Sequence, residues 1–243
     1  STHCISSAAS DVYKRQVLIF NTMETISIHR PKIVVIGSCN TDMVVKANRL
    51  PVPGETILGG TFYMNPGGKG ANQAIAAARL GAEVTFISKI GYDLFGLQAL
   101  EIYRSEKINT EYIFTDQKSP SGVALISVDS FGENSIIVAP GASRSLSIED
   151  INKAEEKIKE ADIILMQLEI PIDTVEYAAT IACKYGKKVI LNPAPASSLS
   201  NSFLMNVHTI LPNRIEAEML SGIKVMNIES AHRAAQALSL IHI

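Results

Sequence analysis

Carboxylates and amides stand directly after apolar runs of this sequence, at places where they could bind the hydroxyl groups of a small polyol. Asn40 and Asp42 follow the apolar run 33–36, and Glu169 follows a predicted strand at 162–168. Carboxylate oxygens accept hydrogen bonds and amides both donate and accept them, which suits the paired hydroxyls of a sugar. One polar residue after a strand is more often a helix cap or a turn former, so the prediction depends on several of them opening on one crevice.

A glycine-rich stretch, NPGGKGANQA at 65–74, runs into a predicted helix and is a second candidate for ligand contact. Its glycines allow positive φ values and a close approach of a ligand, and the amides and dipole at the helix start would face that ligand. Lys69 and Asn72 can donate to its oxygens. The stretch is not a Walker loop, because Gly70 follows the lysine, nor a dinucleotide fingerprint, because Gln73 replaces the third glycine. A turn whose glycines serve packing alone is the alternative.

Asn213 and Glu216 stand three residues apart at the start of another predicted helix. This spacing places both side chains on the same side of the first turn, where they would face phosphate or a metal-bound water. An N-cap residue with a reciprocal glutamate at its third position gives a similar pattern, and both interpretations stay open. Cys39, next to Asn40, is expected to be a small buried residue without chemistry.

The composition is that of a globular protein without a nucleic-acid partner. The 243 residues are 47% hydrophobic, with 24 acidic and 22 basic residues, so neither disorder nor attraction to a polyanion is indicated. The three cysteines, Cys4, Cys39 and Cys183, are far apart and no histidines cluster. This argues against a disulfide framework and a zinc site and makes the cytoplasm the expected location. No apolar run approaches the ~18 residues of a membrane span.

Alternating strand and helix patterns predict an α/β fold, a doubly wound, mostly parallel sheet flanked by helices. Residues 33–36 form a continuous apolar run, as expected for a first strand at 32–37 that helices cover on both faces. Ligands of such sheets bind beyond the carboxyl ends of the strands, where the polar candidates stand. Further strands are predicted at 83–88, 162–168, 188–191 and 207–211, and helices at 94–105, 148–160, 171–185, 214–220 and 229–238.

Two stretches of β-prone residues and turns, about 41–64 and 113–139, predict insertions that form a small sheet outside the main one. Residues 1–30 show no periodicity, and we interpret them as a non-native or disordered leader. Residues 31–243 are then expected to form one α/β domain that is incomplete at its C-terminus, because the last predicted helix has no cap and no following strand.

These features together resemble the PfkB family of carbohydrate kinases. The resemblance rests on GSCNTD at 37–42, PGET at 53–56, GGKGANQA at 67–74, MQLE at 166–169, LNPAPA at 191–196 and PNRIE at 212–216. It covers about 31–238, and the full set in this order is similar to the members that phosphorylate ribose rather than to fructokinases or nucleoside kinases. The implied reaction is transfer of the γ-phosphoryl group of ATP to the primary hydroxyl of D-ribose, which gives ribose 5-phosphate.

The resemblance also implies roles for individual residues. Sugar binding would fall to Asn40, Thr41, Asp42, Gly68, Lys69, Gly70, Ala71, Asn72 and Glu169. Asn213 and Glu216 would bind the nucleotide phosphates, with Glu216 acting on Mg²⁺ through water. The insertions would form a lid that closes over the sugar and joins two copies into a homodimer. ATP, Mg²⁺ and K⁺ are the implied cofactors, and neither nucleic acid nor a membrane is expected as a partner.

One part of the family pattern is missing from the sequence. No stretch like D-T-x-G-A-G-D follows Asn213, although the resemblance implies a glycine-rich anion hole, a general-base aspartate, an adenine pocket and a K⁺ site there. Phosphoryl transfer depends on positioning and on charge stabilisation, so we expect the chain as given to be an inactive fragment of a kinase. The alternatives are another PfkB sugar kinase of the fructokinase type, a catalytically silent sugar-binding module, and an α/β domain without a small-molecule site.

The chain as given is therefore expected to show no ribose-dependent release of ADP in a coupled assay, because the anion hole and the base are lost together. A form of the protein that carries the missing stretch is the positive control and should turn over. Ribose-dependent turnover by residues 1–243 alone would contradict this prediction.

Overall fold

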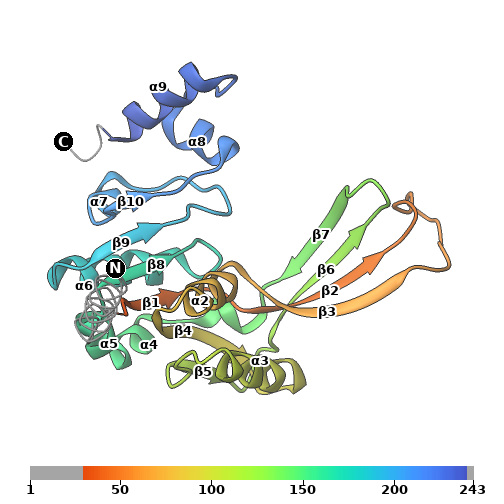
Figure 1. The fold of residues 1–243 in the computed structure, drawn as a ribbon, viewed down its shortest axis with the longest axis horizontal. Helices are drawn as coiled ribbons and strands as arrows, with labels where there is room; N and C mark the ends of the chain where they lie inside the picture. Colours follow the sequence, from red (N-terminus) through yellow and green to blue (C-terminus); the bar gives the residue numbers. More distant parts are fainter. Residues whose placement is uncertain (1–29, 240–243) are drawn as a thin grey trace, which may run out of the picture. The chain divides into compact units, whose positions relative to one another are not determined.

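The computed structural model describes residues 30–239. Its centre is a six-stranded parallel sheet (Figure 1). Its strand order is β10-β9-β8-β1-β4-β5, and every neighbouring pair is parallel. The chain therefore extends the sheet in one direction from β1 to β5 and in the other direction from β8 to β10. The strands span β1 Lys32–Ile36, β4 Glu83–Gly91, β5 Ile113–Asp116, β8 Ile163–Met166, β9 Lys188–Leu191 and β10 Thr209–Ile210.

Helices cover both faces of this sheet, and the predicted doubly wound fold class is thereby confirmed. Val34 and Ile36 of β1 belong to the core beneath α4, α5 and α6, whereas Val35 belongs to the core beneath α2 and α3. All three side chains are at most 3% exposed, because the strand is covered from both sides. The helices span α2 Lys69–Arg79, α3 Leu94–Ser105, η1 Gly141–Ser145, α4 Ile148–Lys153, α5 Glu155–Glu160, α6 Ile172–Lys184, α7 Asn201–Leu204, α8 Arg214–Ser221 and α9 Ile228–Ser239.

The predicted elements agree with the observed ones best where a clear cap or an apolar run bounds them. α3 and β9 have the predicted bounds, 94–105 and 188–191. The predicted helix 148–160 is divided at Ala154, whose backbone (φ −100°, ψ 5°) ends α4 and begins α5. Between residues 30 and 239, no helix combines the length and the apolar character that crossing a membrane requires.

A second, four-stranded sheet, which we call the lid sheet, extends away from the main sheet (Figure 1). Its order is β3-β2-β6-β7, in which β2 is antiparallel to β3 and parallel to β6, and β6 is antiparallel to β7. Its strands span β2 Asn40–Lys46, β3 Thr61–Gly67, β6 Gly122–Val128 and β7 Asn134–Ala139. β2 begins four residues after β1 ends and β3 ends two residues before α2 begins, so the lid sheet is rooted at the carboxyl end of β1.

The second predicted insertion, 113–139, begins too early. Residues 113–116 form β5, which pairs with β4 at the edge of the main sheet. Ile113 is 8% exposed and belongs to the core that contains Phe86, so burial of this side chain holds the strand in the main sheet. Of the predicted leader 1–30, only Arg30 lies among the described residues, and that prediction stays untested.

Replacement of a side chain in the core of the main sheet should lower the free energy of unfolding more than replacement of an exposed side chain in the lid sheet. Ile164 in β8 is 0% exposed, so Ile164→Ala is expected to lower the free energy of unfolding by about 2–5 kcal/mol through the cavity it leaves. Ile137 in β7 is 69% exposed, and Ile137→Ala should change that free energy by less than about 0.5 kcal/mol. Urea unfolding followed by circular dichroism measures both values, and equal losses would contradict the assignment of the core.

Candidate active site

Glu169 and Lys69 form an ion pair where the carboxyl ends of β1 and β8 meet the start of α2. Nζ of Lys69 lies 2.7 Å from Oε1 of Glu169, and the backbone amide of Lys69 donates to Oε2 at 3.0 Å. The hydroxyl of Ser38 donates to the same Oε2 at 2.5 Å. β1 and β8 are neighbours at the point where the strand order diverges, which is where open α/β sheets bind ligands. Three donors thus fix the Glu169 carboxylate at that point.

These donors also favour the ionised form of Glu169. Burial raises the pKa of the carboxyl group, whereas hydrogen bonds from the Lys69 side chain, the Ser38 hydroxyl and the Lys69 backbone lower it. The hydrogen bonds outweigh burial, and the pKa lies below the ordinary value of a glutamate. Glu169 therefore offers a charged acceptor of fixed orientation, which suits a ligand hydroxyl.

Asp42 approaches the backbone of the glycine-rich turn. A Cβ on Gly67 would lie 1.9 Å from Oδ1 of Asp42, so only glycine leaves room for this carboxylate. Burial raises the pKa of Asp42, the negative charge of Glu169 raises it further, and the positive charge of Lys69 lowers it. The net shift is upward, as expected for a desolvated carboxylate that lacks donors. Hydroxyl donors of a ligand would supply what this side chain is missing.

Asn40 holds a buried acceptor that no described residue satisfies. The residue is 6% exposed, and its Oδ1 has no hydrogen-bond partner within residues 30–239. That oxygen lies against β6, because a Cβ on Gly122 would be 2.1 Å away from it. Buried polar atoms without a partner are rare in folded proteins, and this oxygen is enclosed by the protein rather than open to the cavity.

Two neighbouring cavities open at this edge of the sheet. The first, which we call the Glu169 cavity, has a volume of about 390 Å³ and is lined by Ser38, Asn40, Lys69, Val138, Pro140, Arg144, Leu168, Glu169 and Pro195. The second, the Asn213 cavity, has a volume of about 380 Å³ and is lined by Lys69, Asn192, Ala194, Pro195, Leu211, Asn213 and Glu216. Lys69 and Pro195 line both, so the two cavities share a wall. Asp42 lines neither, although the charges of Glu169 and Lys69 act on it.

Asn213 and Glu216 form a reciprocal cap at the start of α8. Oδ1 of Asn213 accepts from the backbone amide of Glu216 at 2.9 Å, and Oε2 of Glu216 accepts from the backbone amide of Asn213 at 2.8 Å. Nδ2 of Asn213 also donates to Oε1 of Glu216 at 2.7 Å. The capping interpretation of this pair is confirmed. Both residues still line the Asn213 cavity, and their contact with phosphate or metal stays a prediction.

Comparison with known families identifies the kind of protein that carries this arrangement. Residues 30–242 match the pfkB family carbohydrate kinases. The chain belongs to the pfkB family. The resemblance predicted from the sequence motifs is thereby confirmed over almost all of the residues on which it rested.

Individual relatives place the chain near the ribokinases within the pfkB family. It is 46% identical over 206 residues to a ribokinase of Haemophilus influenzae, covering 85% of this chain and 67% of that protein. It is 39% identical over 207 residues to a deoxyribokinase of Salmonella typhi, covering 85% and 68%. The solved structure of an Arabidopsis thaliana ribokinase complexed with ribose and ATP matches with a TM-score of 0.78 and 30% identity, covering 87% of this chain and 69% of that chain. The chain spans about two thirds of the length of these proteins.

The glycine-rich stretch of this pfkB chain shapes the site through close packing. A Cβ on Gly68 would lie 2.9 Å from Cα of Cys39, and one on Gly70 would lie 2.7 Å from the carbonyl carbon of Gly37. Ala71 is 0% exposed within the core. These residues bring α2 against the end of β1, so packing accounts for their small size. Their predicted contacts with the sugar, and that of the exposed Asn72, stay predictions.

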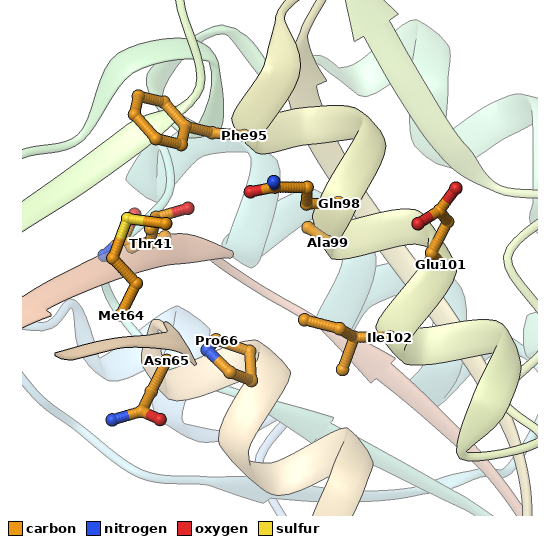
Figure 2. A pocket seen from close by; sticks show the side chains of 10 residues that line it. Thr41, Met64, Asn65, Pro66, Phe95, Gln98, Ala99, Glu101 and Ile102 are labelled. Carbon is orange, nitrogen blue, oxygen red and sulfur yellow. The ribbon is translucent and has the colours of Figure 1, made fainter.

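Thr41 lies apart from Glu169 and Lys69. It lines a third cavity of about 210 Å³ between the root of the lid sheet and α3 (Figure 2). Figure 2 shows its side chain on the side of Met64, opposite residues of α3 such as Phe95 and Gln98. Successive side chains of a strand point to opposite faces, so Thr41 faces this cavity while Asp42 faces the glycine-rich turn. The structure therefore does not bring the Thr41 side chain together with Glu169.

Sequence analysis of this pfkB chain missed two polar residues of the site. Ser38 binds Glu169, and its position directly after the first strand is the signal that could have identified it. Gln167 is 0% exposed, and its Nε2 donates to Oε1 of Gln73 at 2.6 Å, which joins the end of β8 to α2. Nothing in the residue types at those two positions predicts that pairing. Cys39 is buried as expected, and burial raises its pKa to about 11, so the thiol stays protonated.

A methyl group at Gly68 should disturb the site more than one at a glycine of similar backbone conformation elsewhere. Gly68 has φ +88° and the contact with Cys39, whereas Gly186 has φ +65° and nothing within 4 Å of an added Cβ. Gly186→Ala is expected to cost about 1–2 kcal/mol of backbone strain, and Gly68→Ala about 1–3 kcal/mol more from the clash. Chemical denaturation compares the two, and equal costs would show that α2 is free to move away from β1.

Proposed function

We propose that this chain binds D-ribose in the Glu169 cavity and belongs to an enzyme that transfers the γ-phosphoryl group of ATP to the primary hydroxyl of the sugar. The observation that carries the proposal is the pair of carboxylates at that cavity: the oriented Glu169 carboxylate and the desolvated Asp42 beside it. The hydroxyls of a pentose can donate to both, and Asn40 adds an amide to the lining of the cavity. The ribokinase and deoxyribokinase relatives support a pentose over a hexose.

Lys69 has a position that suits charge stabilisation. It lines both the Glu169 cavity and the Asn213 cavity, and its ammonium group is held by Glu169 at 2.7 Å. A phosphoryl group that moves toward a sugar hydroxyl would develop negative charge near the shared wall. A fixed cation there favours that charge without reorganisation. Lys69 would then bind substrate and stabilise the transferring group from the same rotamer.

The Asn213 cavity is the candidate for nucleotide phosphates and Mg²⁺. Both oxygens of Glu216 already accept from Asn213, so a direct metal bond would compete with the cap. A carboxylate oxygen can still accept from a metal-bound water, and Mg²⁺ commonly retains several waters beside phosphate ligands. The residues present therefore fit the indirect role predicted for Glu216. ATP, when bound, supplies the phosphoryl group, and the chain's own groups orient it.

The predicted inactivity of the chain as given, the general-base aspartate and the K⁺ site are not tested by the comparisons and stay predictions. The same holds for the cytoplasmic location. A silent sugar-binding module also remains compatible with the Glu169 cavity, because sugar binding alone would need only the groups that surround it.

The lid sheet offers a surface for the proposed homodimer. Phe62, Leu125 and Ile137 are 58%, 54% and 69% exposed, respectively. The strand register places them on the face opposite Asp42, because Leu125 pairs with Met43 and with Ile137, and Phe62 pairs with Val45. Contiguous apolar patches of this kind mark interaction surfaces. A second copy of the chain would bury this face and leave the Asp42 face to the sugar.

2-Deoxyribose is the second candidate substrate, because one relative is a deoxyribokinase at 39% identity. The two sugars differ by one hydroxyl, and a site that hydrogen-bonds a hydroxyl rejects an analogue without it. Calorimetric titration of the chain with both sugars separates the candidates. Tighter binding of ribose supports the first, tighter binding of 2-deoxyribose the second, and no binding of either contradicts the proposed function.

Asp42→Asn tests the contribution of the Asp42 charge. The variant keeps the shape of the side chain but removes a charged acceptor, so ribose affinity should fall by about tenfold to a hundredfold. Asp162→Asn is the matched control, because Asp162 accepts from the backbone of Lys32 at the opposite end of β1 and should leave affinity unchanged. Equal ribose affinities of Asp42→Asn and the unsubstituted chain would contradict a role of Asp42 in sugar binding.

A further inference from the structure

Ser38 is a buried residue whose two polar groups contact two different elements. It is 1% exposed and follows β1 by two residues. Its hydroxyl donates to Oε2 of Glu169 at 2.5 Å, and its carbonyl oxygen accepts from the backbone amide of Ala71 in the first turn of α2 at 3.0 Å. Ser38 therefore links the end of β1 both to the carboxylate after β8 and to the helix that carries Lys69.

Two glycines of the signature stretch make room for Ser38. A Cβ on Gly70 would lie 2.7 Å from the carbonyl oxygen of Ser38, and one on Gly68 would lie 3.0 Å from it. Any larger residue at these positions would push α2 away from Ser38. The contact with Ser38 thus requires glycine at both positions.

The hydrogen bonds of Glu169 are divided unequally between its two oxygens. Oε2 accepts from the Ser38 hydroxyl and the Lys69 amide, whereas among residues 30–239 Oε1 accepts only from Nζ of Lys69. A carboxylate oxygen can accept two hydrogen bonds, so Oε1 keeps one free acceptor site for a ligand. Without Ser38, Oε2 would also have a free site, and the carboxylate could rotate while it still held Lys69.

We propose that Ser38 is a positioning residue for sugar binding: its hydroxyl locks the Glu169 carboxylate so that Oε1 is the oxygen presented to the sugar. This inference rests on the proposed function, because it assigns Glu169 to sugar recognition. Ser38 itself acts through Glu169.

The charge of Glu169 gives this role a measurable signature. The charged groups that face Glu169 are Lys69 from α2, Asp42 from β2 and Arg144 from η1, which lines the same cavity. The Ser38 hydrogen bond lowers the pKa of Glu169, so its removal should raise that pKa. Sugar affinity that depends on ionised Glu169 is lost as the pH falls through this pKa, and in a variant without the hydroxyl the loss should begin at higher pH.

Ser38→Ala in the 243-residue chain tests the proposal. Carbon-13 NMR titration of the Glu169 carboxyl, assigned with Glu169→Gln, should give a pKa about one unit higher than in the unsubstituted chain. Calorimetry at neutral pH should give a ribose affinity about tenfold lower. Ser145→Ala is the matched control, because the Ser145 hydroxyl also donates to a carboxylate, that of Asp116, at 2.5 Å. It should leave the pKa of Glu169 unchanged.

Two further outcomes keep the test decisive. Ser38→Cys has nearly the same volume and a weaker donor, so the pKa of Glu169 should lie between those of the unsubstituted chain and Ser38→Ala. This variant takes the place of Ser38→Ala if the alanine variant does not fold. An unchanged pKa of Glu169 in a folded Ser38 variant overturns the proposal. If the unsubstituted chain binds neither ribose nor 2-deoxyribose, the proposed function fails, while the NMR titration still decides whether Ser38 positions Glu169.

Discussion

The site depends on one carboxylate that is held away from bulk water by donors from two other segments. Glu169 follows β8, but its donors come from Ser38 after β1 and from Lys69 at the start of α2. A buried carboxylate without donors would take up a proton or move to solvent. The three segments must therefore stay in register, and the parallel pairing of β1 with β8 and the close approach of α2 to β1 both serve that requirement.

The lid sheet is coupled to the same carboxylate through the start of β2. Asn40 and Asp42 lie in β2, which begins within a few residues of Ser38. Movement of the lid strands relative to the main sheet would carry both side chains with it, while Glu169 and Lys69 stay on the main sheet and α2. The acceptors for a sugar thus belong to two bodies, and a bound sugar would bridge them. If the two sheets move relative to one another, a sugar held by acceptors from both would favour the closed arrangement.

Local patterns were sufficient to predict most of the fold and to bring Lys69 and Glu169 under suspicion as partners of one site, whereas their contacts with a ligand stay predictions. The apolar run of β1 and the periodicity of α3 are local signals, and both elements were correctly predicted. The assignment of 113–116 to the lid failed because membership of a sheet is decided by distant partners, here β4 and the core around Phe86. The position of Ser38 after the first strand placed it near the site, but its partner lies 131 residues away, so the sequence did not reveal the hydrogen bond to Glu169.

Asn213 and Glu216 illustrate why two interpretations of one pattern need not exclude each other. Their cap satisfies the backbone amides of Asn213 and Glu216 at the start of α8, and it also fixes both side chains at the wall of the Asn213 cavity. A free glutamate at that wall would lose conformational entropy when it met a hydrated metal or a phosphate, whereas the capped one is already ordered. The cap would thus order the pair before any ligand contact, in the way that we propose for Ser38 and Glu169. On both sides of Lys69, hydrogen bonds within the protein orient the acceptors before any ligand arrives.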